Sequence, residues 1–95
     1  MAVLVGVVSW ELEIIGAHSL KEKRSVVKSL KARLHEKFNV SVAETDHHDV
    51  WQRCELTACV VSGTRSHADE VLRSADDLVA KEYRARIIST NRQFL

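Results

Sequence analysis

The feature that most constrains the fold is a strict alternation of side chains in two separate segments. Over residues 3–15, one side of the extended chain is apolar throughout, while the other side changes from valine to serine and glutamate halfway along. Residues 51–61 alternate in the same manner. A period of two residues predicts a β-strand with one buried face, so we expect two long strands.

Helical spacing occurs in two other segments. Over residues 20–38 the apolar side chains recur every three or four positions, which predicts an amphipathic helix. Ser19 followed by Glu22 is a capping-box signature and marks the start of this helix. A second helix is predicted to start at Ser66, because acidic residues fill the turn that follows it.

Two shorter strands complete the pattern, one over residues 40–44 and one over residues 85–95. The order strand, helix, strand, strand, helix, strand is that of the ferredoxin-like βαββαβ fold. Right-handed crossovers place both helices on one face of a four-stranded antiparallel sheet and leave the other face open. We therefore predict an α+β two-layer sandwich with the first and third strands at its centre. Residues 1–95 are expected to form a single domain.

Cysteine usage and the N-terminal segment bear on the compartment. Cys54 and Cys59 are the only cysteines. Five residues apart on one strand, they would point to opposite faces roughly 16 Å apart, too far for a disulfide. The apolar N-terminal run lacks a basic leader and turns polar at Glu11, which is untypical of a signal peptide or membrane span. We expect a cytoplasmic protein without membrane association.

The net charge of +1 indicates no class of partner, but the charges are unevenly distributed. Residues 20–38 carry seven Lys or Arg and two Glu, whereas residues 66–83 carry two Lys or Arg and five Asp or Glu. Several basic side chains of the first helix share an arc of about 80° on its surface. This basic stripe consists of Lys21, Arg24, Lys28, Lys31 and His35.

The basic stripe predicts a negatively charged partner, because like charges four residues apart on a helix repel one another. Lys and Arg side chains on one face can neutralise the phosphates of a nucleic acid, so we expect contact with RNA or a ribosomal partner. The alternative is a solvated helix face, or one whose charges are balanced by the second helix. The carboxylates available there are Asp69, Glu70, Asp76 and Asp77.

The open face of the sheet is a second candidate surface. If the first and third strands pair, their apolar ends form one exposed patch, and such patches usually mark a partner surface. This valine patch consists of Val3, Val5, Val7, Cys59 and Val61. It predicts a homodimer through the open face, unless the terminal segment covers it.

Aromatic residues give one further candidate contact. Trp51 is an additional interface candidate, because tryptophan is enriched at the energetic centres of interfaces. Trp10 is expected in the core. The first strand places no aromatic side chain on the open face, which argues against base stacking of the kind used by RNA-recognition sheets.

The run over residues 44–49 contains residue types that bind zinc or manganese. Asp46, His47 and Asp49 would be the ligands of a small metal-dependent enzyme. Adjacent histidines on an extended backbone point apart, however, and Asp side chains commonly form hydrogen bonds within turns. We favour a polar loop and expect no cofactor, no metal site and no catalytic residue.

Three segments together resemble a known family of small bacterial proteins. They are residues 19–24 (Ser-Leu-Lys-Glu-Lys-Arg), residues 39–44 (Asn-Val-Ser-Val-Ala-Glu) and residues 49–53 (Asp-Val-Trp-Gln-Arg). On these segments the chain is similar to the YlxP-like proteins, a family whose domain is of unknown function. The resemblance implies a ferredoxin-like fold and no established activity or cofactor. Genes of this family often lie beside those for translation initiation and ribosome maturation factors, which implies a non-enzymatic accessory role near the ribosome.

Overall fold

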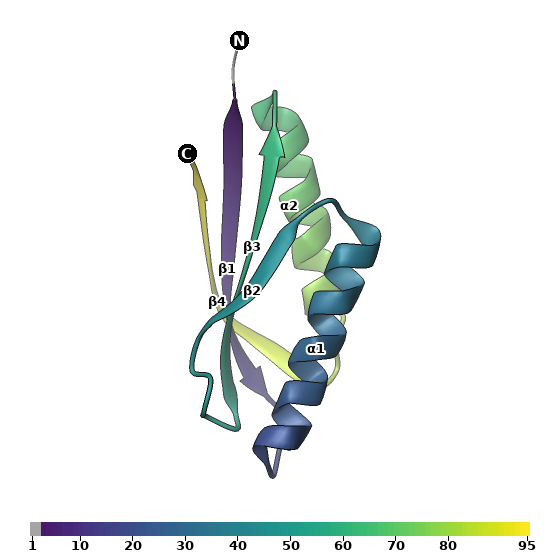
Figure 1. The fold of residues 1–95 in the computed structure, drawn as a ribbon, viewed down its shortest axis with the longest axis vertical. Coiled ribbons are helices and arrows are strands. Elements are labelled where there is room, and N and C mark those ends of the chain that lie inside the picture. Colours follow the sequence, from purple (N-terminus) through teal and green to yellow (C-terminus); the bar gives the residue numbers. More distant parts are fainter. Residues whose placement is uncertain (1–2) are drawn as a thin grey trace.

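Six elements follow one another along residues 3–95, the part of the chain that the computed structural model describes. Neighbouring strands are antiparallel, and their order in the sheet is β2-β3-β1-β4. Both helices pack against one face of the sheet and leave the other open (Figure 1). The predicted ferredoxin-like α+β sandwich is confirmed. Its elements are β1 (Leu4–Ile14), α1 (Leu20–Lys37), β2 (Ser41–Asp46), β3 (Arg53–Ser62), α2 (Arg65–Ala80) and β4 (Ala85–Phe94).

The central pair of strands is β1 and β3, as the ferredoxin-like order of elements predicted. Val5 lies opposite Val61 and Val7 lies opposite Cys59 in this pair. Beyond β4, the backbone of Leu95 exchanges two hydrogen bonds with Val5, at 2.8 and 3.1 Å. The end of the chain therefore extends the sheet beside the start of β1 (Figure 1).

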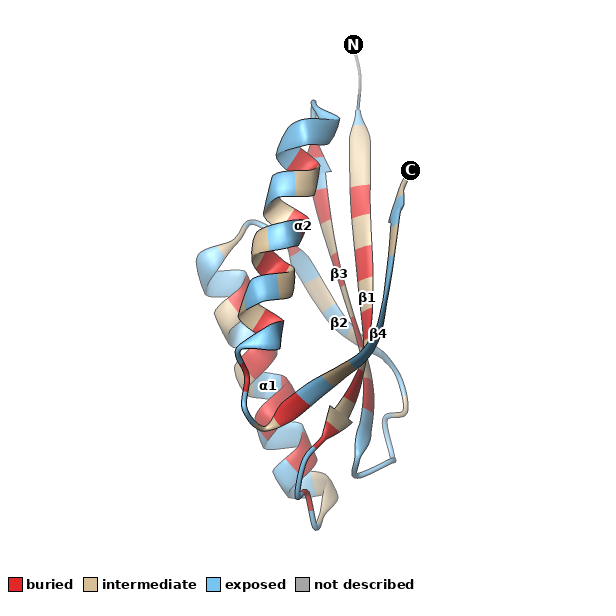
Figure 2. Cartoon of the chain, turned by 180° about the vertical axis from the view of Figure 1, so that it is seen from behind, coloured by how far each residue is buried: buried red, intermediate tan, exposed pale blue. Residues whose placement is uncertain are grey.

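The core lies between the sheet and the two helices. Every second residue of β1 is buried from Gly6 onward, and buried positions also recur along both helices (Figure 2). Trp10 is fully buried, as predicted, and its indole N–H donates a hydrogen bond of 2.8 Å to Asp76 on α2. The one polar atom of this large side chain is thus satisfied inside the core.

The two helix starts follow the same local chemistry, but only one was placed correctly from the sequence. The Ser19 hydroxyl accepts a hydrogen bond from the Glu22 N–H at 3.1 Å, so Ser19 is the N-cap of α1. The second helix begins at Arg65 rather than Ser66. Its N-cap is Thr64, whose hydroxyl accepts a hydrogen bond from the His67 N–H at 3.3 Å. A threonine that precedes a serine by two residues offers the same capping oxygen earlier in the chain.

Candidate nucleic-acid interface

The basic stripe lies on the outer side of α1. Lys21, Arg24, Lys28 and His35 are exposed, and Lys31 is half-buried. Three of the five residues line a shallow groove of about 270 Å³ between α1 and the edge strand β2. The groove is lined by Arg24, Val27, Lys28, Lys31 and Glu44. The fold therefore brings part of the stripe to a concave surface rather than leaving it on an isolated convex helix.

The charges of the stripe are largely uncompensated within residues 3–95. Arg24 alone of the five forms an ion pair there, with Asp49 at 4.0 Å, and both side chains are mostly exposed. Such a pair contributes little to stability.

Asp69 and Asp76, two of the four carboxylates named for α2, contact elements other than α1. Asp69 pairs with Arg73 and with Arg92 of β4, and Asp76 pairs with Arg92. These contacts direct Asp69 and Asp76 toward their own helix and the sheet rather than toward α1. Asp69 and Asp76 thus do not balance the basic stripe.

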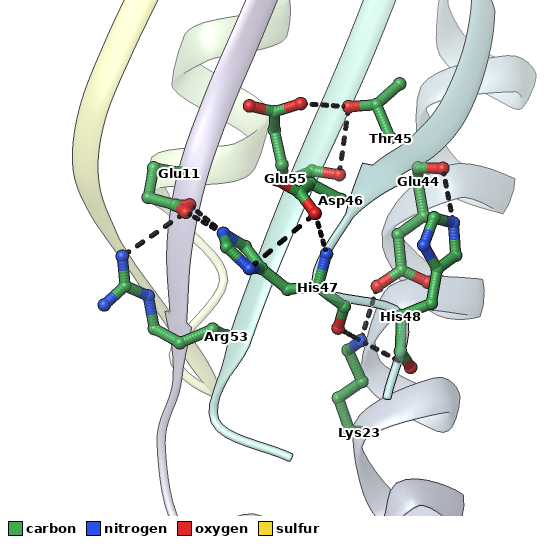
Figure 3. Close-up of polar contacts among 9 residues, drawn as sticks. All are labelled: Glu11, Lys23, Glu44, Thr45, Asp46, His47, His48, Arg53 and Glu55. Atoms are coloured by element: carbon green, nitrogen blue, oxygen red, sulfur yellow. Dashed lines mark hydrogen bonds and ion pairs between the residues drawn. The ribbon is translucent and has the colours of Figure 1, made fainter. Parts of the chain in front are cut away.

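Lys23 occupies a position that the charge pattern alone did not reveal. Its side chain is fully buried, and its ammonium group lies 2.5 Å from the Glu44 carboxylate. The same nitrogen donates to the backbone carbonyl oxygens of His47 at 2.8 Å and His48 at 3.3 Å (Figure 3). The available signal was its helical spacing, because Lys23 precedes the buried Val27 and Leu30 by four and seven residues.

The loop that Lys23 holds contains a residue with an unusual backbone. His47 has a φ of +64°, in the left-handed region that few non-glycine residues adopt. Its backbone N–H donates to the Asp46 carboxylate at 2.8 Å, and its ring Nε2 lies 2.6 Å from the Glu11 carboxylate. Glu11 also pairs with Arg53 at 3.3 Å (Figure 3). The imidazole is thereby fixed against the open face of the sheet.

The three residues considered as metal ligands do not all converge, since Asp46 lies 3.9 Å from the His47 ring but Asp49 does not join them. The Asp49 carboxylate lies near Arg24, while the His47 ring contacts Glu11. The His48 ring nitrogen lies 3.0 Å from the Glu44 carbonyl oxygen, away from its neighbour (Figure 3). In the described range 3–95, no three His, Cys, Asp or Glu side chains are grouped so that they could hold a metal ion. The hydrogen bond that the His47 backbone N–H donates to the Asp46 carboxylate fits the polar-loop interpretation instead.

The valine patch is assembled as the strand register predicted, at the end of the open face where β1 begins. Val3 and Val61 are 70% and 69% exposed, while Val5, Val7 and Cys59 are half-buried. The C-terminal segment does not cover the patch, because Leu95 pairs with Val5 within the plane of the sheet. Leu95 is itself exposed and enlarges the apolar area.

Trp51 does not lie with the valine patch. It precedes β3, ten residues from Val61, which corresponds to about 33 Å along an extended strand. The interface residues proposed from the sequence therefore belong to two separate surfaces at opposite ends of the sheet.

The two cysteines lie on opposite faces of β3, and both are free. Cys54 is fully buried, and burial, reinforced by the negative charge of Glu44, raises the pKa of its thiol to about 12. A thiol in this state is a poor nucleophile at neutral pH. Cys59 lies half-buried on the open face.

Neither helix among the described residues is long and apolar enough to cross a membrane. The strand order, the two helices on one face and the open opposite face define a protein of the ferredoxin-like α+β class. Residues 5–92 match the family described as "Protein of unknown function (DUF503)", and the chain belongs to this family.

The comparison with curated proteins agrees with this assignment. The "Uncharacterized protein YlxP" of Bacillus subtilis (strain 168) is 39% identical over 70 residues, which make up 74% of this chain and 76% of the relative. The resemblance to YlxP-like proteins that the sequence indicated is therefore confirmed.

Two solved structures are similar in fold. A C-terminal segment of the alpha subunit of aIF2 from Pyrococcus abyssi aligns over 96% of this chain with a TM-score of 0.52 and 16% identity, and the chain spans 49% of that segment. A de novo designed protein with a ferredoxin fold gives a TM-score of 0.49 and 15% identity, with 99% of this chain and 85% of that chain covered. At such identities the likeness concerns the fold alone.

Proposed function

We propose that this chain is a non-enzymatic accessory domain that binds RNA through the basic stripe of α1. The observation that carries the proposal is the absence, within residues 3–95, of any ion pair to Lys21, Lys28 or Lys31, although they lie on the same helix face. Repulsion between such charges costs a few tenths of a kcal/mol per pair, and a phosphate backbone relieves it. The gene neighbourhood that the family resemblance implies favours a ribosomal RNA or a ribonucleoprotein as the partner.

The proposed site of action is the cytoplasm. A reducing environment suits a protein with two free cysteines, one of them exposed in part on the sheet face. A cytoplasmic domain of this kind also has access to RNA.

A salt series of filter binding to ribosomal RNA tests the proposal. Four phosphate contacts from Lys21, Arg24, Lys28 and Lys31 predict a slope of about −3 for log affinity against log salt with single-stranded RNA. The affinity is then expected to fall about 50-fold between 50 and 200 mM salt. Substituting Lys28→Ala and Lys31→Ala together should reduce the magnitude of the slope by about 1.4.

A matched control distinguishes binding through the basic stripe from attraction of RNA by the net positive charge of the protein. Lys37 and Lys81 are exposed, lie at the ends of α1 and α2, and are not part of the basic stripe. The double variant Lys37→Ala/Lys81→Ala changes the net charge by the same amount and should keep the wild-type slope. Equal losses in both double variants, or unchanged RNA affinity in the stripe variant, would contradict the proposal.

A second candidate function is homodimerisation through the valine patch. It is favoured by the contiguity of exposed apolar side chains, since Val61 lies opposite Val5, and Leu95 lies on the other side of Val5. Sedimentation at micromolar concentration should then give a dimer for the wild type and a monomer for Val61→Lys. Val50→Lys, an exposed valine in the β2–β3 loop, is the control and should remain dimeric. A monomeric wild type at all concentrations would remove this candidate.

A further inference from the structure

The loop between β2 and β3 carries an exposed tryptophan and contacts the basic stripe through Asp49. Trp51 is 44% exposed and the neighbouring Val50 is 42% exposed. Two residues before Trp51, the Asp49 carboxylate lies 4.0 Å from Arg24 of the stripe. The Gln52 side chain, which follows Trp51, donates to Ala17 ahead of α1, so the loop with the exposed ring and the first cations of α1 lie at the same end of the molecule.

The loop that carries Trp51 is held at several points. Lys23 donates to the carbonyl oxygens of His47 and His48, and the Val50 N–H donates to the His47 carbonyl oxygen at 3.1 Å. On the other side of Trp51, the backbone carbonyl oxygen of Gln52 accepts from the Ile14 N–H at 2.8 Å. The Gln52 side chain donates to the Ala17 carbonyl oxygen at 3.1 Å. A ring presented on a fixed loop loses little conformational freedom when a ligand stacks on it.

We infer that the basic stripe and Trp51 together form a site for single-stranded RNA, with phosphates on α1 and one unpaired base stacked on Trp51. This inference rests on the proposed RNA-binding function and adds the class of RNA. Duplex bases are stacked inside their own helix, so an aromatic platform gains affinity only from a base that is free to leave the stack. The stacking differs from that of RNA-recognition sheets, because Trp51 lies in a loop and not on a central strand.

Asp49 sets the affinity of this site. Its carboxylate competes with phosphate for Arg24 and adds negative charge near the backbone of the RNA. Replacing it by the isosteric amide, Asp49→Asn, should raise the affinity for single-stranded RNA several-fold at low salt. The neighbouring carboxylates are engaged elsewhere, since Glu44 pairs with Lys23 and Asp46 accepts from the His47 N–H.

Tryptophan fluorescence gives a direct readout, because the chain contains two tryptophans and one of them is fully buried. Titration with an oligouridine should quench the fluorescence of Trp51 and leave the fluorescence of Trp10 unchanged. The Trp51→Phe variant contains only Trp10 and shows its fluorescence separately. Trp51→Ala should weaken binding of the oligouridine about 10-fold and leave binding of a double-stranded RNA of equal length unchanged. Trp51→Phe keeps a ring and should retain most of the affinity.

The outcomes separate this inference from the function on which it rests. If Lys28→Ala/Lys31→Ala weakens both RNAs while Trp51→Ala binds both as the wild type does, the stacking site is wrong and RNA binding stands. If Trp51→Ala weakens both RNAs equally, Trp51 does not discriminate single strands and the inference is likewise overturned. If neither RNA binds to the wild type, the proposed function and the inference fail together.

Discussion

Removal of the Lys23 side chain should destabilise the protein far more than removal of any lysine of the basic stripe. Lys23→Met keeps the length and helix propensity of the side chain but leaves the Glu44 carboxylate, which is 15% exposed, without its cation. It also removes the donor to two carbonyl oxygens of the β2–β3 loop. Breaking one side of a buried ion pair costs about 3–5 kcal/mol.

This cost is large relative to the total stability of a small domain. The free energy of unfolding of most domains is about 5–15 kcal/mol. At about 4–8 °C per kcal/mol for a chain of this size, Lys23→Met should lower the melting temperature by about 12 °C or more. Urea denaturation followed by circular dichroism measures the free energy of unfolding, and thermal denaturation measures the melting temperature independently.

Lys28→Met is the matched control, because it lies on the exposed side of the same helix and should change stability by less than about 0.5 kcal/mol. The double variant Lys23→Met/Glu44→Leu removes both charges and should be more stable than Lys23→Met alone, since no unpaired carboxylate remains. Two results would refute this prediction. Lys23→Met would lower the free energy of unfolding no more than Lys28→Met does, or adding Glu44→Leu to Lys23→Met would lower it further by as much as Glu44→Leu does alone.

Three further outcomes follow from single positions. Arg84 and Arg33 lower the pKa of the buried Glu82 from 4.5 to about 2, so the stability that its carboxylate contributes is complete above pH 4.5 and is lost as the pH falls through about 2. Between pH 5 and pH 2 the free energy of unfolding should therefore fall by about 3 kcal/mol through this group, and denaturation curves of Glu82→Gln should lack this part of the fall. Iodoacetamide at pH 8 should modify Cys59 in the native protein and spare the buried Cys54, which a mass spectrum of the peptides checks. Gly6→Ala should destabilise by about 1–3 kcal/mol in urea, because its methyl group would lie 3.0 Å from a Leu72 methyl carbon.

Most of the fold could be predicted from the sequence because its elements have clear periods. The alternation in β1 and β3 indicated which side chains are buried, whereas the register of Val5 opposite Val61 became known only from the structure. Element starts were less certain where two capping residues stand close together, as Thr64 and Ser66 do before α2. Local chemistry there permits either start, and packing of the whole helix decides between them.

The candidate site was only partly predictable, because its contacts join residues far apart in the sequence. The basic stripe follows from the spacing on one helix, and four of its five residues are exposed while Lys31 is half-buried. The pairing of Lys23 with Glu44 spans 21 residues, and the contact of His47 with Glu11 spans 36. A helical pattern assigns Lys23 to the buried side of α1, but only the position of β2 shows which carboxylate meets it there.

Lys23 also connects the stability of the fold to the proposed binding surface. Its ammonium group contacts β2 through Glu44 and the following loop through His47, and that loop carries Asp49 and Trp51. If Lys23 only filled space in the core, an apolar residue could replace it without changing the conformation of the loop at the surface. Because this lysine contacts the loop, its loss should disturb Trp51 and the Arg24 contact of Asp49, while the basic side chains farther along α1 remain in place. In the proposed site, the buried cation would thus separate two requirements: charge along the helix for affinity, and a fixed loop at its end for the choice of RNA.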